Sequence, residues 1–147
     1  MNYEKFIQKM ESEHALIRQA FDKLKSIIDS GSISDSAFIL TVVEQLKSIL
    51  TVHLKDEDNL FYPDMRKKAV ELKQEALLPA LDIFIGDMKG ISKRVFNFFT
   101  KYNTEKAISA NEKAFINGIV EIRDALIKRI DSEEKTLYYI YKAYHDL

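Results

Sequence analysis

The chain has 147 residues, of which 46% are hydrophobic and 31% charged, and with only four glycines and two prolines it is typical of a helical globular protein. The formal net charge is −1, with basic and acidic residues interleaved, so no basic face is available for nucleic acid. The absence of cysteine excludes disulfides, thiolate zinc sites, iron–sulfur clusters and thiol catalysis, so any metal must be bound by histidine and carboxylate.

The length favours a single domain spanning residues 1–147. The N-terminal stretch MNYEKFIQKM lacks the apolar core of a signal peptide, and no stretch approaches about 18 uninterrupted apolar residues. We therefore expect a cytoplasmic protein that does not cross a membrane.

The first predicted helix carries apolar side chains at alternating steps of four and three over about 25 residues. Its only polar interruption is His14. Glycine and serine in residues 30–36 predict a turn, with Ser34 or Asp35 as the N-cap of the next helix. The stripe consists of Phe6, Met10, His14, Ile17, Phe21, Leu24 and Ile28.

The second predicted helix begins near Ser36 and contains an unusual pair, His53 and Glu57. Residues four apart lie on the same helix face, one turn removed, and a buried carboxylate needs a partner. This spacing is one by which helices hold metals. The apolar stripe on the same face is Ile39, Val42, Leu46, Ile49 and Leu60.

The second helix is expected to end or kink at Pro63, just after Phe61 and Tyr62, with residues 64–76 as a short helical continuation. A third helix is expected to begin near Pro79. Its stripe contains Leu81, Phe84, Met88, Ile91, Val95 and Phe98.

The last predicted helix follows a connection at residues 101–108, and Ser109 with Glu112 matches a capping box at its start. Two charged residues, Arg129 and Glu133, interrupt its otherwise apolar stripe. That stripe is Phe115, Ile119, Ile122, Leu126, Arg129, Glu133, Leu137, Ile140 and Tyr144.

The unusual positions recur at nearly one interval. His14 and His53 are 39 residues apart, and Met88 and Arg129 are 41 residues apart. This pattern indicates a repeated helical hairpin. Two such hairpins predict an all-α, up-down-up-down four-helix bundle with a central site between facing helices.

These residues resemble the hemerythrin-like, or HHE cation-binding, family over nearly the whole chain. The resemblance implies a bundle that holds two iron ions, with a histidine from each of four helices and bridging carboxylates from the second and fourth. His14, His53 and Glu57 match that pattern by position and context, and Glu133 matches the carboxylate of the fourth helix. The two remaining histidine positions are occupied by Met88 and Arg129.

The resemblance assigns the first two histidines to one iron and the other two to the second iron, so this chain keeps only the first set. Arg129 is then expected beside the cofactor, where its guanidinium bridges the two carboxylates in place of the second metal. The expected ligands of one ion, iron first and zinc or manganese as alternatives, are His14, His53, Glu57 and Glu133, with one position open to water.

Met88 stands at the cofactor position, and we interpret it as core packing because a thioether is a poor ligand for ferrous iron. A haem held between His14 and Met88 would leave the carboxylates unexplained. Arg129 could instead extend outward along its stem.

A metal-free site is the main alternative, because Arg129 and one protonated histidine would already neutralise the two carboxylates. Glu134 competes with Glu133 for the ligand role. The flanking acidic residues Glu13, Asp56, Asp58 and Glu134 are expected on solvated faces. The tail is interpreted as packing, with Tyr144 on the core stripe and Tyr138, Tyr139 and Tyr141 spread around the helix.

The sequence therefore predicts a non-haem metal-binding protein with an altered, mononuclear site. We expect it to sense or bind oxygen, redox or nitric-oxide-type ligands rather than transport oxygen, because one iron cannot supply both electrons needed to carry oxygen as peroxide. The closed site would keep one positive charge, which favours a small anion such as hydroxide or nitrite. The different-class alternative is a metal-free interaction or regulatory module. No nucleophile with a base and no phosphate loop supports an enzyme.

Overall fold

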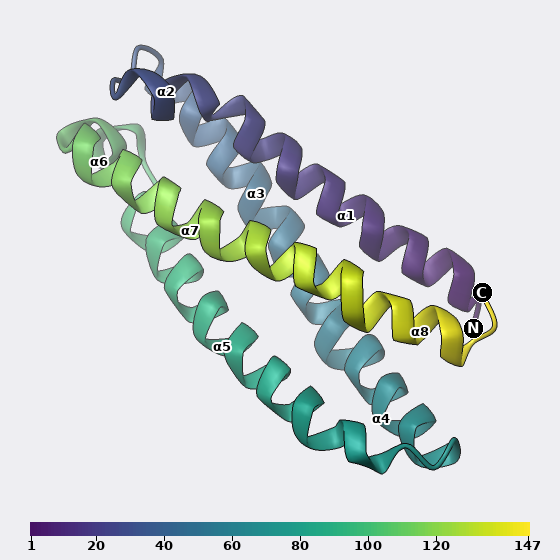
Figure 1. The fold of residues 1–147 in the computed structure, drawn as a ribbon. Helices are drawn as coiled ribbons and strands as arrows, with labels where there is room; N and C mark the ends of the chain where they lie inside the picture. The colour runs from purple at the N-terminus through teal and green to yellow at the C-terminus, as the bar shows by residue number, and fades with distance from the viewer.

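Four long helical rods form the protein, and the computed structural model describes all of residues 1–147. The absence of any strand confirms the all-α class, and the alternating direction of successive rods confirms the predicted bundle (Figure 1). Contacts of α1 and α5 with both α3 and α7 close the bundle around one core. The rods are α1 (Tyr3–Lys23), α3 (Ser36–Asp56) continued by α4 (Tyr62–Glu71), α5 (Leu78–Lys101), and α7 (Glu112–Ser132) continued by α8 (Tyr138–Tyr144).

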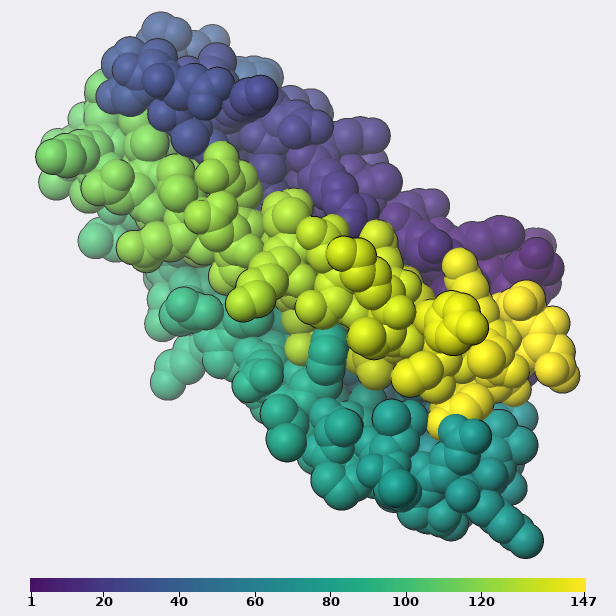
Figure 2. All heavy atoms as spheres, in the orientation of Figure 1, coloured from purple at the N-terminus to yellow at the C-terminus, as the bar shows by residue number.

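Short elements close the two ends of the bundle. Helices α2 (Lys25–Ser30) and α6 (Glu105–Ala110) lie together at one end. Both chain termini lie at the opposite end, where the 3₁₀ turn Glu75–Leu77 joins α4 to α5 (Figure 1). The space-filling view shows α7 and α8 running between α1 and α5 on one face (Figure 2).

Short polar side chains begin several helices. Asp35 accepts a hydrogen bond from a backbone N–H of the first turn of α3, which confirms it as the N-cap. Asn111 caps α7 in the same way, so the capping box predicted at Ser109 is wrong. Ser109 lies inside α6, because Thr104 already begins a helix within the predicted connection 101–108.

The first predicted helix is interrupted once. α1 ends at Lys23, and the chain resumes as α2 after Leu24, which is fully buried. The interruption changes the register, so Ile27 rather than Ile28 lies in the core.

Two π-helical turns interrupt the second and fourth rods at equivalent places, Glu57–Phe61 and Glu133–Leu137. Each begins at a buried glutamate, Glu57 or Glu133. Pro63 does not end the helix, because it occupies the first turn of α4, where a missing N–H is tolerated. The sequence predicted that the helix ends or kinks at Pro63, and the structure interrupts the α-helix a few residues earlier, at the π turn Glu57–Phe61.

Because of the π turns, several residues within and beyond them do not lie where α-helical spacing predicted. A π turn contains more residues than an α turn, so every later side chain moves around the helix axis. Leu60, predicted in the core, is 43% exposed, and Ile140 and Tyr144 are only half-buried. The side chains that enter the core instead are Phe61, Tyr138 and Tyr141.

The core consists of two apolar clusters with a polar layer between them. The larger cluster fills the end of the bundle near α2 and α6 and includes Met88, and the smaller aromatic cluster fills the end near the termini. The polar layer contains the buried residues Glu13, His14, His53, Glu57, Arg129 and Glu133.

The continuous helical segment Ser36–Glu71 is long and apolar enough to cross a membrane by length and composition alone. The core helix of a bundle passes the same test. Here the segment also places His53 and Glu57 in the buried polar layer.

Candidate metal centre

Four donor groups from three rods converge in the polar layer. His14, His53, Glu57 and Glu133 each offer one donor atom, and these atoms all lie within 4.8 Å of one another. The structure thus brings together the four residues expected as metal ligands. All four are almost completely buried, so their charges and lone pairs must be satisfied by one another or by a bound cation.

The distances between these donors match those around a single ion. Nε2 of His53 lies 3.1 Å from Nε2 of His14 and 3.0 Å from Oε1 of Glu57, and Nε2 of His14 lies 3.6 Å from Oε2 of Glu133. An ion with ligand bonds of about 2.0–2.2 Å separates adjacent ligands by about 3.0–3.5 Å. The donor set therefore fits one metal ion.

In both Glu57 and Glu133, one carboxylate oxygen accepts a hydrogen bond from a neighbouring side chain and the other does not. The Tyr62 hydroxyl donates to Oε2 of Glu57 at 3.0 Å, and Nε of Arg129 donates to Oε1 of Glu133 at 2.9 Å. The remaining oxygens, Oε1 of Glu57 and Oε2 of Glu133, are buried and have no hydrogen-bond donor unless Nε2 of His53, 3.0 Å from Oε1 of Glu57, carries a proton. Buried orphan oxygens are rare in proteins, and here both belong to the cluster that fits a cation.

The two histidines are oriented by carboxylates behind them. Nδ1 of His53 donates to Glu13 at 2.9 Å, and Nδ1 of His14 donates to Glu134 at 3.1 Å. With a proton on each Nδ1, both Nε2 atoms present lone pairs toward the centre of the cluster. Two lone pairs that face each other at 3.1 Å require a proton or a metal ion between them.

Surface cations hold these outer carboxylates in turn. Arg18 donates to both oxygens of Glu134 at 3.0 and 2.9 Å, and Lys9 pairs with Glu13 at 3.2 Å. Burial raises the pKa of Glu13, but its bonds to His53 and Lys9 outweigh this and lower it. Glu13 was expected on a solvated face and is instead buried, so that prediction is wrong.

Glu133, rather than Glu134, contributes to the central cluster. Glu134 lies on the outer side of His14 and is only partly buried. Glu133 and Glu134 are adjacent in the chain and contact opposite nitrogens of His14. Glu133 faces Nε2, on the side of the other donors, and Glu134 faces Nδ1, on the outer side.

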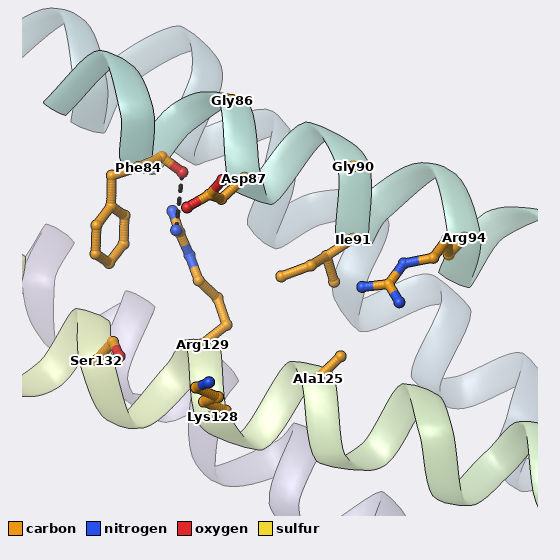
Figure 3. Close-up of a pocket in the computed structure, with 10 residues that line it drawn as sticks. All are labelled: Phe84, Gly86, Asp87, Gly90, Ile91, Arg94, Ala125, Lys128, Arg129 and Ser132. Atoms are coloured by element: carbon orange, nitrogen blue, oxygen red, sulfur yellow. Dashed lines mark hydrogen bonds between the residues drawn. The ribbon is translucent and has the colours of Figure 1, made fainter. Parts of the chain in front are cut away.

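Arg129 points into the bundle, so the alternative in which it extends outward is wrong. Its Nη2 donates to the Tyr62 hydroxyl at 3.0 Å. Its Nη1 donates to the backbone carbonyl of Phe84 at 2.8 Å, the bond drawn in Figure 3. The Phe84 ring lies 3.5 Å from the guanidinium carbon. Arg129 therefore holds Glu133 directly and Glu57 through Tyr62.

A groove of about 740 Å³ between α5 and α7 leads to this guanidinium (Figure 3). Gly86 and Gly90 leave its α5 wall open. Arg94 and Lys128 add positive charge at its sides, and Asp87 adds one negative charge. Arg129 is thus the part of the polar layer that borders this groove.

Met88 contributes nothing to the donor cluster. It is buried in the larger apolar cluster and is not one of the four donors. This placement agrees with the packing interpretation. His145 also lies elsewhere, where it bonds to Asp64 and stacks on Tyr3.

Sequence analysis missed two tyrosines that flank the cluster, Tyr62 and Tyr138. The Tyr138 hydroxyl lies 3.0 Å from Nε2 of His14, with its ring stacked on the imidazole. Each tyrosine follows a buried glutamate by five residues, a spacing that a π turn brings onto one face. The repeated Glu-x₄-Tyr spacing was the available signal.

Without a metal, the cluster holds a proton tightly. Burial lowers the pKa of His53, but its bonds to Glu13 and Glu57 and the charge of Glu133 raise it to about 10. Burial and the charge of Glu133 raise the pKa of Glu57. A divalent ion would therefore compete with the proton that otherwise lies between the histidine and the carboxylates.

Comparison with protein families found one match. The family model described as the hemerythrin HHE cation binding domain matches residues 5–141. Comparison with curated proteins and with solved structures found no match.

Proposed function

Because the chain belongs to the hemerythrin HHE cation-binding domain family, we propose that it binds a single non-haem metal ion, with iron as the first expectation and zinc or manganese as alternatives. The ligands are His14, His53, Glu57 and Glu133.

One observation carries the proposal. Two buried carboxylate oxygens without hydrogen-bond partners face two imidazole nitrogens whose opposite nitrogens already donate to carboxylates. All four atoms present lone pairs to one point. A cation at that point satisfies them together, whereas one proton satisfies only one donor–acceptor pair.

The residues on the other side of the layer support one ion rather than two. Met88 offers no hard donor, and the guanidinium of Arg129 brings a fixed positive charge beside Glu133. The outer oxygen of each glutamate is already bound by Arg129 or Tyr62. A second cation would lack ligands and would meet repulsion from the arginine.

A bound ion would supply Lewis acidity and, if it is iron, one-electron redox chemistry. Glu13 and Glu134 keep the imidazoles aligned, and Arg129 keeps Glu133 directed inward. The two glutamates and Arg129 leave one positive charge on a site with a divalent ion, which favours a small anion or a diatomic ligand as an additional partner. We therefore infer a role in sensing or binding such ligands.

The second candidate function is a metal-free interaction or regulatory module. It is favoured by the electrostatic closure of the cluster, because Arg129 and a protonated His53 together balance Glu57 and Glu133. In this case the polar layer would serve only to fix the packing of the rods.

Elemental analysis of protein purified without chelator separates the two candidates. We expect one ion per chain in the wild type and a loss of most of that metal in Glu57→Gln. Glu44→Gln is the matched control, because Glu44 lies on the exposed face of the same helix, α3. Metal-free wild type would favour the regulatory module, and two ions per chain would contradict the mononuclear site.

A further inference from the structure

Tyr138 is a buried phenol aimed at the centre of the donor cluster. Its side chain is 1% exposed, and its hydroxyl lies 3.0 Å from Nε2 of His14, the nitrogen that faces the proposed ion. The ring is fixed from two sides, by stacking on His14 and by an edge contact with Phe61. The hydroxyl therefore has little freedom to turn away.

The π turn is what places this hydroxyl there. Residues five apart in an α-helix are separated by about 140° around the axis, so Glu133 and Tyr138 would not share a face. The π-helical turn Glu133–Leu137 brings them onto one face. π turns are frequent at functional sites, and this one serves both a proposed ligand and the phenol.

Tyr62, at the equivalent place after Glu57, provides a comparison. Its hydroxyl donates to Glu57 and accepts from Arg129, so both of its hydrogen-bonding roles are filled within the protein. The Tyr138 hydroxyl bonds to the nitrogen of His14 and otherwise faces only the carboxylate of Glu133. The two tyrosines are alike in sequence position and differ in how completely they are paired.

Metal binding takes both acceptors away from the Tyr138 hydroxyl. Once Nε2 of His14 binds an ion, its lone pair no longer accepts a hydrogen bond from Tyr138. Oε2 of Glu133, the inner oxygen of the nearby carboxylate, is directed to the same ion. A buried hydroxyl without an acceptor is unfavourable. Binding of the hydroxyl oxygen to the ion would remove this cost.

We propose that Tyr138 is a fifth ligand, which binds the ion as a phenolate through its hydroxyl oxygen and favours ferric iron. The phenol proton passes to solvent when the ion enters. Two carboxylates, one phenolate and Arg129 sum to two negative charges, so a divalent ion gives a neutral site and ferric iron leaves one positive charge. This inference rests on the proposed metal-binding function.

The test uses the colour of the iron-loaded protein. Ferric iron bound to a phenolate absorbs visible light by charge transfer from the ligand, whereas ferric iron bound only to histidine and carboxylate lacks this band. We load the full chain with iron(II), oxidise it in air, and record the visible spectrum and the iron content per chain. We expect a visible band with one iron per chain.

Tyr138→Phe keeps the ring and its packing and removes only the oxygen. We expect it to lose the band completely and to bind iron more weakly by at least about 10-fold, the smallest loss typical of removing even an outer-shell partner. Tyr141→Phe is the matched control, since it removes the hydroxyl of another buried tyrosine, which packs in the smaller aromatic cluster and bonds to none of the four donors, and it should keep the band. Resonance Raman spectra of wild type with ring-deuterated tyrosine should show shifted phenolate modes, which identifies the band as that of a tyrosinate, while the variants assign it to Tyr138.

The outcomes separate the two proposals. Iron-loaded wild type without a phenolate band, or a band that survives in Tyr138→Phe, would overturn the fifth ligand and leave the metal site intact. A band that disappears only in Tyr141→Phe would also overturn it. A wild type that binds no iron, zinc or manganese would overturn the proposed function and this inference together.

Discussion

The two sides of the polar layer solve the same electrostatic problem in different ways. On the side of α1 and α3, His14 and His53 present lone pairs toward the glutamates and bring no fixed charge. On the side of α5 and α7, Arg129 brings a permanent cation and Met88 an apolar side chain. The histidine side therefore needs a bound metal ion or proton to balance the glutamates, whereas on the other side Arg129 supplies the positive charge.

The difference also extends to the outer residues. The histidine side is supported by carboxylates and surface cations, Glu13 with Lys9 and Glu134 with Arg18. The arginine side is supported by a backbone carbonyl and the Phe84 ring. The first arrangement tunes and orients ligands, whereas the second fixes a charge.

Removing the internal cation should have the largest effect. Arg129→Met leaves buried Glu133 without its charged partner, so we expect metal-free protein to lose about 3–5 kcal/mol of unfolding free energy. Urea unfolding of chelator-treated protein measures this. Arg94→Met, an exposed arginine beside the same groove, should change stability by less than about 0.5 kcal/mol. A loss below about 1 kcal/mol for Arg129→Met would show that the guanidinium does not replace a metal charge.

Removing a ligand from the other side should affect metal more than folding. We expect His53→Gln to lower metal affinity at least about 100-fold, or about 2.7 kcal/mol, because a donor facing the ion is lost. Isothermal titration calorimetry with zinc gives the value. His145→Gln is the control, since His145 bonds to Asp64 away from the cluster. Equal zinc affinity in both variants would place the ion elsewhere.

The two sides can also be made alike. Met88→His combined with Arg129→His restores a nitrogen donor at each altered position and removes the fixed charge. We expect the double variant to bind a second ion per chain, with the single Met88→His variant remaining near one because Arg129 still repels a second cation. Elemental analysis after iron loading counts the ions. A double variant that stays at one ion would remove the explanation offered for the single site.

The smallest effect should come from the outer carboxylates. Glu134→Gln weakens the hold on Nδ1 of His14, so we expect metal affinity to fall about 10- to 100-fold with little change in folding. Asp131→Asn is the control, because Asp131 contacts Arg18 and not the histidine. Zinc calorimetry compares the two, and an unchanged affinity in Glu134→Gln would limit Glu134 to a surface ion pair.

Helical periodicity was sufficient to predict the four rods and to find the residues of the central cluster. His53, Glu57 and Glu133 lie before or at the start of a π turn, and His14 lies in α1, which has none, so α-helical spacing holds for all four. Their polar character on apolar stripes marked them as unusual.

The same periodicity failed beyond each π turn. It placed Ile140 and Tyr144 in the core, where both are only half-buried, and gave no special position to Tyr138, which is buried. A local change from the α to the π hydrogen-bond pattern leaves no mark in hydrophobic spacing alone. The outer carboxylate Glu13 was missed for another reason, since its partner His53 lies on a different helix and 40 residues away.

The position of the ion is the central claim, and anomalous diffraction at the iron edge from crystals of the iron-loaded protein measures it directly. We predict one anomalous peak per chain, at about 2.0–2.2 Å from Nε2 of both histidines and from the inner oxygens of both glutamates. Two peaks, or one peak beside Arg129 and away from His14 and His53, would contradict the account.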